Sequence, residues 1–485
     1  MPVNMAESPP AARRIAHLDM DAFFASVTLL RYPQLRDLPM VIGGSRMSAQ
    51  ALVMQIDALH PGHGYAAQLA RCMVSSDGVH APAGESGTGG PAESDGSDGS
   101  DGSGGGGGGD AGDGAQGALL SATAPDIPDA TPALEALLAR IDPAHFPRLQ
   151  GYRGRGVTTT ATYAARAFGL GSGMGLTRAA RLCPQAILLP IDFDRYRAYS
   201  RRFKAIILSE APVMEDRGID EVFIDLSALP GVQADGGRAV AAHIQARIQA
   251  ETGLSCSIGV APNKLLAKMA SDFDKPHGIS ILYPEDLQAR IWPLPCRLIN
   301  GIGPRTDARL RTLGVETIGQ LAARPLSWLT QHFGVRTGQW LHEVAWGRDE
   351  RPVADRGEPV SISRETTFER DLHAVHDRAL LGTLFTELAQ KTAQDLERKG
   401  YVGRTVGIKL RYADFRTVTR DLTVREAVWR AEDIRRLAGQ CLKRVDLSQR
   451  MRLLGIRVAS LERRDTPRPP PEPENLELEF FWSDP

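Results

Sequence analysis

Two short acidic clusters contain the residues best suited to chemistry in this chain of 485 residues. One spans residues 16–24 and the other residues 218–226, and each has the β-branched and aromatic neighbours of a half-buried strand. If the two strands lie side by side, Asp19, Asp220 and Glu221 converge. Three carboxylates at one point favour Mg²⁺ or Mn²⁺, and a pair of such ions can promote phosphoryl transfer. A single aspartate at a strand end is usually a turn or capping residue, but two clusters followed by aromatics need another explanation.

Further motifs follow the first cluster in one order along the chain. They are Asp19-Met20-Asp21-x-Phe23-Phe24, Tyr163-Ala164-Ala165-Arg166, Asp220-Glu221, Gly259-Val260-Ala261-Pro262-Asn263-Lys264 and Lys275-Pro276-x-Gly278. This order closely resembles that of the Y-family DNA polymerases, specifically their bacterial DinB (DNA polymerase IV) branch. The resemblance covers most of residues 13–465 apart from one long insert. It implies template-directed addition of deoxynucleotides to a primer 3′ end, in error-prone translesion synthesis.

The resemblance also implies a multidomain α/β (α+β) fold with the right-hand architecture of polymerases. The predicted domains are a ferredoxin-like palm (13–22 and 185–278), small fingers (23–184), a helical thumb with a helix-hairpin-helix (279–350), a linker (351–360) and a little-finger domain (361–465). Residues 1–12 are predicted to be a disordered leader, and 466–485 a tail. Since no segment remains for a proofreading exonuclease, we expect low fidelity.

Residues 45–150 interrupt the predicted fingers as a low-complexity insert. Residues 76–128 are dominated by Gly, Ser, Asp, Pro and Ala, and cannot bury enough apolar area to offset the entropy of ordering. We therefore expect them to be disordered. The flanks at 48–72 and 131–141 contain enough Ala, Leu and Ile to form helices.

The formal net charge of −1 conceals two regions of opposite charge. The insert has 4 basic against 13 acidic side chains, whereas the rest of the chain has 53 against 45. Residues 358–465 alone have 22 basic against 16 acidic side chains. A basic face on a polymerase would meet the phosphates of primer-template DNA.

Composition indicates a cytoplasmic protein without a membrane partner, and we expect a monomer. No apolar run approaches the roughly 20 residues of a membrane span, and the N-terminus lacks the apolar core of a signal peptide. The five cysteines are scattered without a CxxC pair, as expected for reduced thiols rather than a zinc or disulfide framework.

By resemblance, Asp19, Asp220 and Glu221 are the catalytic carboxylates. Two Mg²⁺ ions, with Mn²⁺ as a possible substitute, would be held by Asp19, the Met20 carbonyl, and Asp220 or Glu221. These ions would activate the primer 3′-hydroxyl and stabilise the leaving pyrophosphate. The family often has Ser where this chain has Gly218, which could alter the support of Asp220.

Tyr163 and Arg166 lie one helical turn apart and could together hold the triphosphate of a deoxynucleotide. The alternative is an exposed Arg beside a core Tyr. Lys275 matches the family lysine that meets the same phosphates, in a Pro/Gly setting suited to a loop. Tyr196 resembles a second aromatic of the nucleotide site.

Phe24 has the most specific predicted role, that of a steric gate against ribonucleotides. Resemblance places its ring beneath the deoxyribose, where a 2′-hydroxyl would collide with it. Adjacent residues of a helix face different ways, so Phe23 is predicted to belong to the core instead.

Residues 299–305 resemble a helix-hairpin-helix in which Gly301 and Gly303 let backbone N–H groups approach a DNA phosphate. A plain helical turn is the alternative. Candidate backbone contacts in the predicted little finger are Arg364, Arg411, Arg416 and Arg420. For each of these, a solvated surface position is the alternative.

The tail contains a peptide similar to the Gln-Leu-x-Leu-x-aromatic sequences that bacterial polymerases insert into the sliding clamp. The clamp contacts would be Asn475, Leu476, Leu478 and Phe480, with Asn475 in place of the usual Gln. The alternative is an apolar tail without a partner.

Two other functions compete with an active polymerase. A catalytically inactive, polymerase-like DNA-binding accessory protein would have no reason to keep Asp19, Asp220 and Glu221. A nucleotide cyclase can share the palm and paired metals, but it needs neither a thumb nor a basic little finger.

Overall fold

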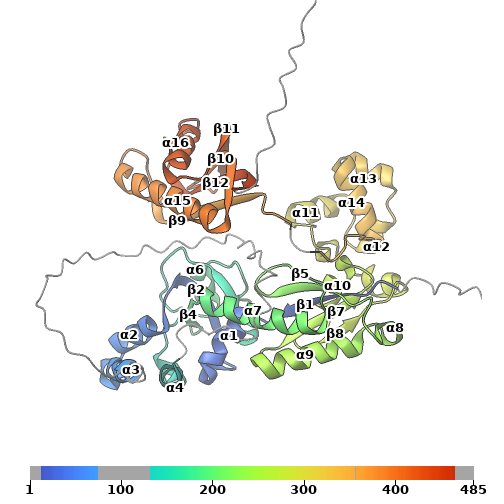
Figure 1. Ribbon diagram of the computed structural model, residues 1–485, viewed down its shortest axis with the longest axis horizontal. Coiled ribbons are helices and arrows are strands. Elements are labelled where there is room, and N and C mark those ends of the chain that lie inside the picture. Colours follow the sequence, from blue (N-terminus) through green and yellow to red (C-terminus); the bar gives the residue numbers. More distant parts are fainter. Residues whose placement is uncertain (1–11, 75–130, 355–356, 465–485) are drawn as a thin grey trace, which may run out of the picture. The chain divides into compact units, whose positions relative to one another are not determined.

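The computed structural model describes residues 12–74, 131–354 and 357–464, which form two compact units (Figure 1). The first unit ends at Gly357 and the second begins at Glu358, inside the predicted linker. Within these described ranges, no helix is long and apolar enough to cross a membrane.

The first unit is built around a five-stranded palm sheet. Its strands, in spatial order, are β5 (Met214–Asp216), β6 (Glu221–Asp225), β1 (Ile15–Met20), β7 (Cys256–Ala261) and β8 (Ile279–Ile281). Strand β1 is antiparallel to both β6 and β7, while β7 and β8 are parallel. The sequence prediction that the two acidic strands lie side by side is confirmed.

Two apolar layers cover this sheet, because successive side chains of a strand point to opposite faces. Ala16, Leu18 and Met20 share one core with α7 (Phe193–Glu210) and α9 (Arg238–Thr252), which follows the short α8 (Val232–Asp235). Ile15 belongs instead to a second core, with α10 (Lys264–Ala270) and the thumb helices.

A separate three-stranded sheet forms the fingers. Strand β2 (Met40–Arg46) lies between β3 (Thr158–Ala161) and β4 (Ile187–Ile191), antiparallel to the first and parallel to the second. Around it lie α1 (Phe23–Arg31), η1 (Pro33–Leu35), α5 (Tyr163–Arg166) and α6 (Leu176–Leu182). The palm boundary predicted at 185 is therefore wrong, because the backbone of β4 pairs with β2 in the fingers sheet and not with a strand of the palm.

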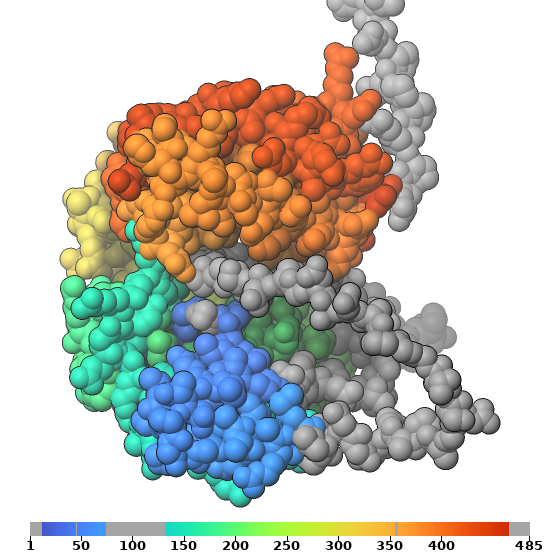
Figure 2. Space-filling model, turned by 90° about the vertical axis from the view of Figure 1, so that its left-hand side faces the viewer, coloured from blue at the N-terminus to red at the C-terminus, as the bar shows by residue number. Residues whose placement is uncertain are grey.

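Both described flanks of the predicted insert are helical, as expected. They form α2 (Ala49–Leu59), η2 (Pro61–His63), α3 (Tyr65–Val74), α4 (Pro132–Leu138) and η5 (Pro143–His145), and α2 and α3 are blue in Figure 2. Ser48 and Thr131 cap α2 and α4, and Leu52, Ile56 and Leu138 join the main core. The prediction of disorder at 76–128 lies outside the described residues.

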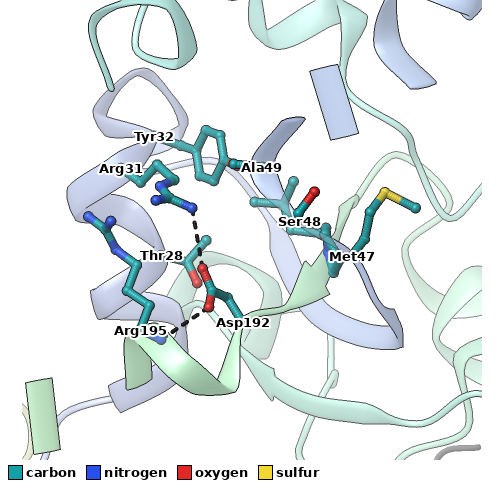
Figure 3. Close-up of a pocket in the computed structure, with 10 residues that line it drawn as sticks. Thr28, Arg31, Tyr32, Met47, Ser48, Ala49, Asp192 and Arg195 are labelled. Atoms are coloured by element: carbon teal, nitrogen blue, oxygen red, sulfur yellow. Dashed lines mark hydrogen bonds and ion pairs between the residues drawn. The ribbon is translucent and has the colours of Figure 1, made fainter. Parts of the chain in front are cut away.

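Glu135 of α4 anchors the insert to two buried arginines. Its Oε1 lies 2.9 Å from Arg31 of α1 and 3.1 Å from Arg195 of α7, whose side chains are about 5% exposed. Asp192 also accepts a hydrogen bond from Arg31, in a pocket between α1 and the start of α2 (Figure 3). None of the predicted site residues lines this pocket.

Replacing Glu135 should destabilise the first unit. Glu135→Ala leaves Arg195 without its carboxylate in the core, and we expect it to lower the free energy of unfolding by about 2 kcal/mol. Thermal unfolding of the full chain measures this. The matched control is Glu387→Ala, which removes an exposed pair with Lys391 and should cost under ~0.5 kcal/mol. Equal effects of the two substitutions would contradict the anchoring role.

The thumb completes the first unit. It contains η6 (Leu287–Ile291), η7 (Cys296–Leu298), α11 (Pro304–Thr312), α12 (Ile318–Ala322), α13 (Leu326–Phe333) and α14 (Val335–Ala345). Buried Leu310, Leu321, Leu329 and Leu341 unite these helices with α10 of the palm. The rest of the segment 279–350 is thus predominantly helical, as predicted. The thumb boundary predicted at 279 is wrong, because β8 pairs with β7 in the palm sheet.

The second unit is a four-stranded sheet covered on one face by two helices. The strand order is β11 (Thr417–Val428), β10 (Tyr401–Tyr412), β12 (Met451–Arg463) and β9 (Ser361–Leu372), and every neighbouring pair is antiparallel. The helices α15 (Arg378–Lys399) and α16 (Ala431–Leu442) pack on Val406, Ile408 and Leu410. This confirms the predicted small sheet backed by two helices.

Candidate functional site

The pairing of β1 with β6 places the acidic clusters beside one another. Asp19 and Glu221 are direct partners across the two strands, and the Met20 N–H donates to the Asp220 carbonyl at 3.0 Å. The three carboxylates therefore come from the adjoining ends of two strands of one sheet. Their donor set is all oxygen, which suits a hard divalent cation.

The charges of these carboxylates are only partly compensated. Burial, followed by the nearby charges of Asp19 and Glu221, raises the pKa of Asp220 to about 6. Asp220 has no ion pair with any residue in the described ranges. Lys275 Nζ lies 2.6 Å from Asp19 Oδ2, and Lys268 pairs with Glu221.

A divalent cation fits this arrangement, because Asp220 is a half-buried carboxylate that repels its two neighbours and lacks a cationic partner. No trio of His, Cys, Asp or Glu side chains in the described part of the chain is already closed around a single point. Closing the carboxylates on an ion therefore requires side-chain rotation, for which Lys268 and Lys275 must release Glu221 and Asp19.

A buried network behind Glu221 was not found from the sequence. His17 Nε2 lies 3.4 Å from Glu221, and its Nδ1 lies 2.8 Å from Ser271 Oγ. Although burial opposes the charged form, hydrogen bonds from His17 and Lys268 lower the pKa of Glu221 to about 2. Burial lowers the pKa of His17 itself. The only signal in the sequence is that His17 lies two residues before Asp19 on one strand, so both face the same side.

Asp21 holds the loop that presents Lys275. It is 3% exposed, accepts a hydrogen bond from Ser257 Oγ at 2.7 Å and accepts the His277 N–H at 2.9 Å. The Asp19 carboxylate raises the pKa of Lys275 despite the opposing effect of burial. The predicted phosphate-binding lysine therefore lies beside the carboxylates, and Asp21 positions its loop.

The loop before Asp220 is held by Lys204 of α7. Lys204 Nζ lies 2.8 Å from Asp216 and donates to the Gly218 carbonyl at 2.6 Å. A Cβ on Gly218 would lie 3.7 Å from Asp220 Oδ1, an ordinary van der Waals contact. Serine would thus fit at this position, with its hydroxyl group near Asp220.

Phe24 and Phe23 differ as predicted. Phe23 is 2% exposed, whereas Phe24 is only half-buried. The Phe24 ring packs on Tyr196 with centroids 4.5 Å apart, and Phe193 meets its edge at 5.9 Å. Ala22, just before the helix, has the left-handed φ of 45° that turns the chain from β1 into α1.

Tyr196 is a core residue, in contrast to the expectation that it is a second aromatic of the nucleotide site. Its side chain is fully buried, and its hydroxyl group lies 3.0 Å from Thr28 Oγ1. Burial raises the pKa of Tyr196 to about 12. It therefore supports the Phe24 ring from within the core.

Tyr163 and Arg166 are the first and last residues of the short helix α5. The guanidinium group of Arg166 is 4.9 Å from the centre of the Tyr163 ring, and its Nε donates to the Ala161 carbonyl. Burial, then the charge of Asp21, raises the pKa of Tyr163, and Lys275 and Asp19 also act on it. The Tyr163 hydroxyl group is therefore near enough to Asp21, Asp19 and Lys275 for their charges to act on it.

The two glycines of the predicted DNA-binding hairpin in the thumb have different surroundings. Gly301 has a φ of 111°, and a Cβ there would lie 2.7 Å from the Trp340 ring. Gly303 precedes α11, and a Cβ at this residue would meet nothing within 4 Å. The backbone around Gly303 is therefore open to a phosphate group.

In the second unit, Arg364 lies on the helix-covered face of the sheet, opposite buried Ile456. It forms a bidentate ion pair with Asp395 of α15: Nε donates to Oδ2, and Nη2 donates to Oδ1 at 2.9 Å. Because this ion pair holds the Arg364 side chain against α15, Arg364 is not proposed as a DNA contact. Arg420, opposite buried Ile408, is on the same side and donates to backbone carbonyls.

Among residues 358–464, no helix covers the other face of the sheet, and we call it the open face. Arg411 lies there and donates to Thr417, whereas Arg416 lies in the adjoining hairpin turn and is exposed. Two further basic residues of the open face were not predicted from the sequence. Lys409 reaches across Gly455 to Glu365 at 2.7 Å, and Arg457 reaches across Gly407 to Asp421 at 2.9 Å. The predicted clamp peptide, 475–481, lies outside the described residues.

The raised pKa of Asp220 leads to a prediction about stability in the presence of a chelator. The folded protein binds a proton at Asp220 more readily than the unfolded chain does, so its stability falls as pH rises from about 4 to about 6. Asp220→Asn removes this penalty and should raise the free energy of unfolding by about 2 kcal/mol at pH 7.5, with little gain at pH 4. Asp194→Asn, on the exposed surface of α7, is the control. An Asp220→Asn gain independent of pH would contradict the assignment.

Family models match most of the folded chain. The impB/mucB/samB family model matches residues 18–58 and 147–272, and the model of its C-terminal domain matches 359–469. The family model of the DNA polymerase-iota thumb domain matches residues 297–349. Residues 59–146 lie outside these matches.

Relatives that are similar over most of their length are named DNA polymerase IV. The protein of Alkalilimnicola ehrlichii is 40% identical over 339 residues, covering 68% of this chain and 93% of the relative. That of Halorhodospira halophila is also 40% identical, over 343 residues, covering 68% of this chain and 94% of the relative.

Solved structures share the fold. A Y-family DNA polymerase chimera built from Dbh and Dpo4 matches with a TM-score of 0.64 and 18% identity, covering 92% of this chain and 98% of that one. An insertion ternary complex of Dbh DNA polymerase matches with a TM-score of 0.52 and 18% identity, and it also covers 92% of this chain and 98% of that one. The chain therefore belongs to the Y-family DNA polymerases, in the branch named DNA polymerase IV, and is a DNA-directed DNA polymerase.

Proposed function

We propose that this polymerase performs error-prone translesion synthesis by a two-metal mechanism, without proofreading. The observation that carries the proposal is the pairing of Asp19 with Glu221, next to a half-buried Asp220 that forms no ion pair within the described residues. Such a site gains most from binding divalent cations, because they remove the repulsion among the carboxylates.

Asp19, Asp220, Glu221 and the Met20 carbonyl would hold two Mg²⁺ ions, or Mn²⁺ in their place. When bound, these ions supply charge stabilisation for the attacking 3′-oxygen and for the leaving pyrophosphate. Lys204 fixes the backbone before Asp220, and Asp21 fixes the loop that presents Lys275. The two segments are therefore positioned before substrate arrives, and only the carboxylate side chains have to rotate onto the ions.

Lys275, Tyr163 and Arg166 would bind the triphosphate of the incoming deoxynucleotide. Lys275 is held at Asp19 in this structure, so the same ammonium group can turn from a carboxylate to a phosphate oxygen. Tyr163 is 42% exposed and can offer its hydroxyl group. Phe24 would lie beneath the sugar, supported by buried Tyr196.

Primer-template DNA would contact the hairpin at Gly301 and Gly303, together with Arg411 and Arg416 of the second unit. The open face adds Lys409 and Arg457, whose carboxylate partners limit the net charge until phosphates arrive. The tail would bind a sliding clamp. We further propose a monomeric, cytoplasmic enzyme.

Primer extension on a templated hairpin, with and without Mg²⁺, tests the proposal. A polymerase adds templated nucleotides only with the divalent cation. An accessory protein would bind the hairpin without extending it, and a cyclase would convert free nucleotide without using the template.

A further inference from the structure

Three histidines in the insert lie together, although they are far apart in the sequence. The ring centroids of His145 and His63 are 4.1 Å apart, those of His145 and His60 are 4.4 Å apart, and those of His60 and His63 are 6.2 Å apart. We call this group the histidine cluster. All three residues lie outside the segments that match the family models, so no part of the polymerase site uses them.

Two short turns built alike bring the rings together. His60 and His63 bracket η2, where Pro61 fixes the first position and Gly64 ends the turn with a φ of 64°. In such a 3-10 turn, side chains three residues apart project to the same side. The second turn, η5, also begins with a proline and ends at His145, and the Asp142 side chain caps it at 2.8 Å.

We propose that the histidine cluster is a binding site for a divalent transition-metal ion, of which Zn²⁺ is the representative. Imidazole nitrogen is a preferred ligand of such ions. With Zn–N bonds of about 2.0–2.1 Å, tetrahedral imidazoles have ring centroids about 5.2 Å apart. The observed separations, 4.1 to 6.2 Å, span this value.

Hydrogen bonds at the other ring nitrogens support the proposal. His145 Nδ1 lies 2.8 Å from the Tyr65 hydroxyl group, and His63 Nδ1 lies 3.4 Å from the His60 carbonyl. Imidazoles that bind metal use such contacts to orient the ring and leave Nε2 free for the ion.

The rings are tilted in the metal-free chain and must rotate to converge, as the carboxylates of the palm must. Rotation is feasible because His60, His63 and His145 are on the surface of the molecule, where α2 and α3 form an exposed lobe (Figure 2). Three protein ligands leave the fourth position for water. A bound ion would tie the turn after α2 to the turn before β3.

Titration of the full-length protein with Co²⁺ tests the site, because tetrahedral Co²⁺ absorbs visible light. The Asp19→Asn variant, saturated with Mg²⁺, serves as parent so that palm carboxylates do not compete. We expect one equivalent of Co²⁺ with tetrahedral bands, displaced by Zn²⁺. His63→Gln with His145→Asn should abolish these bands, and circular dichroism should show an intact fold.

Two further variants separate a metal site from chance stacking of exposed rings. His376→Gln breaks a similar ring pair in the second unit, with centroids 4.8 Å apart, and should leave binding unchanged. Tyr65→Phe should weaken Co²⁺ affinity by roughly 10- to 100-fold, because it removes the group that orients His145. The absence of tetrahedral bands in the parent, or their persistence in the double variant, would overturn the proposal.

Discussion

Asp19→Asn and Asp220→Asn should each reduce nucleotide addition by at least ~10³-fold while leaving the affinity for primer-template DNA nearly unchanged. Each substitution removes a charged ligand from a site that we propose to hold two ions, and a 10³-fold loss corresponds to about 4 kcal/mol of transition-state stabilisation. The affinity is preserved because the proposed phosphate contacts lie in the thumb and the second unit.

The measurement is the single-turnover extension rate at saturating Mg²⁺, with DNA affinity determined by fluorescence anisotropy. Asp225→Asn is the matched control, since Asp225 lies at the other end of β6, opposite Ile15. It should extend primers at close to the wild-type rate. Wild-type extension by Asp19→Asn or Asp220→Asn would refute the assignment of the active site.

Phe24→Val should admit ribonucleotides. Shrinking the ring opens space below C2′, and no hydrogen bond at that position has to be replaced. Each ~1.4 kcal/mol of clash that is removed changes the discrimination tenfold, so we expect the preference for deoxynucleotides to fall by ~10²-fold or more. Use of deoxynucleotides should decline only modestly, since Tyr196 still packs beneath residue 24 from within the core.

The measurement is kcat/KM for matched ribo- and deoxynucleotides on one template. Phe23→Leu is the control, because Phe23 is adjacent in sequence but packs in the core against Phe203. It should lower stability and leave the sugar preference unchanged. If Phe24→Val keeps the wild-type ratio, the Phe24 ring is core packing and does not meet the sugar.

Much of the architecture could be predicted because local patterns and motif order are properties of the sequence. The acidic strands, the helix at Tyr163, the helical thumb and the sheet of the second unit all carry alternating or helical spacing of apolar residues. The boundary at 185 could not be predicted in this way. Residues 187–191 read as a buried strand in either sheet, and only pairing with β2 assigns them to the fingers.

The sequence alone determined which residues could carry the chemistry: the carboxylates Asp19, Asp220 and Glu221, and the aromatic Phe24 beside them. Only the tertiary structure decided how these residues are partnered. Lys268 of α10 and Lys275 of the following loop form ion pairs with the carboxylates. Tyr196 belongs to the core instead of the nucleotide site, and Arg364 forms an ion pair with Asp395 instead of remaining available to DNA. The physical reason is that residue type and local spacing fix what a side chain can do, whereas its burial and its charged neighbours depend on contacts between segments far apart in the chain.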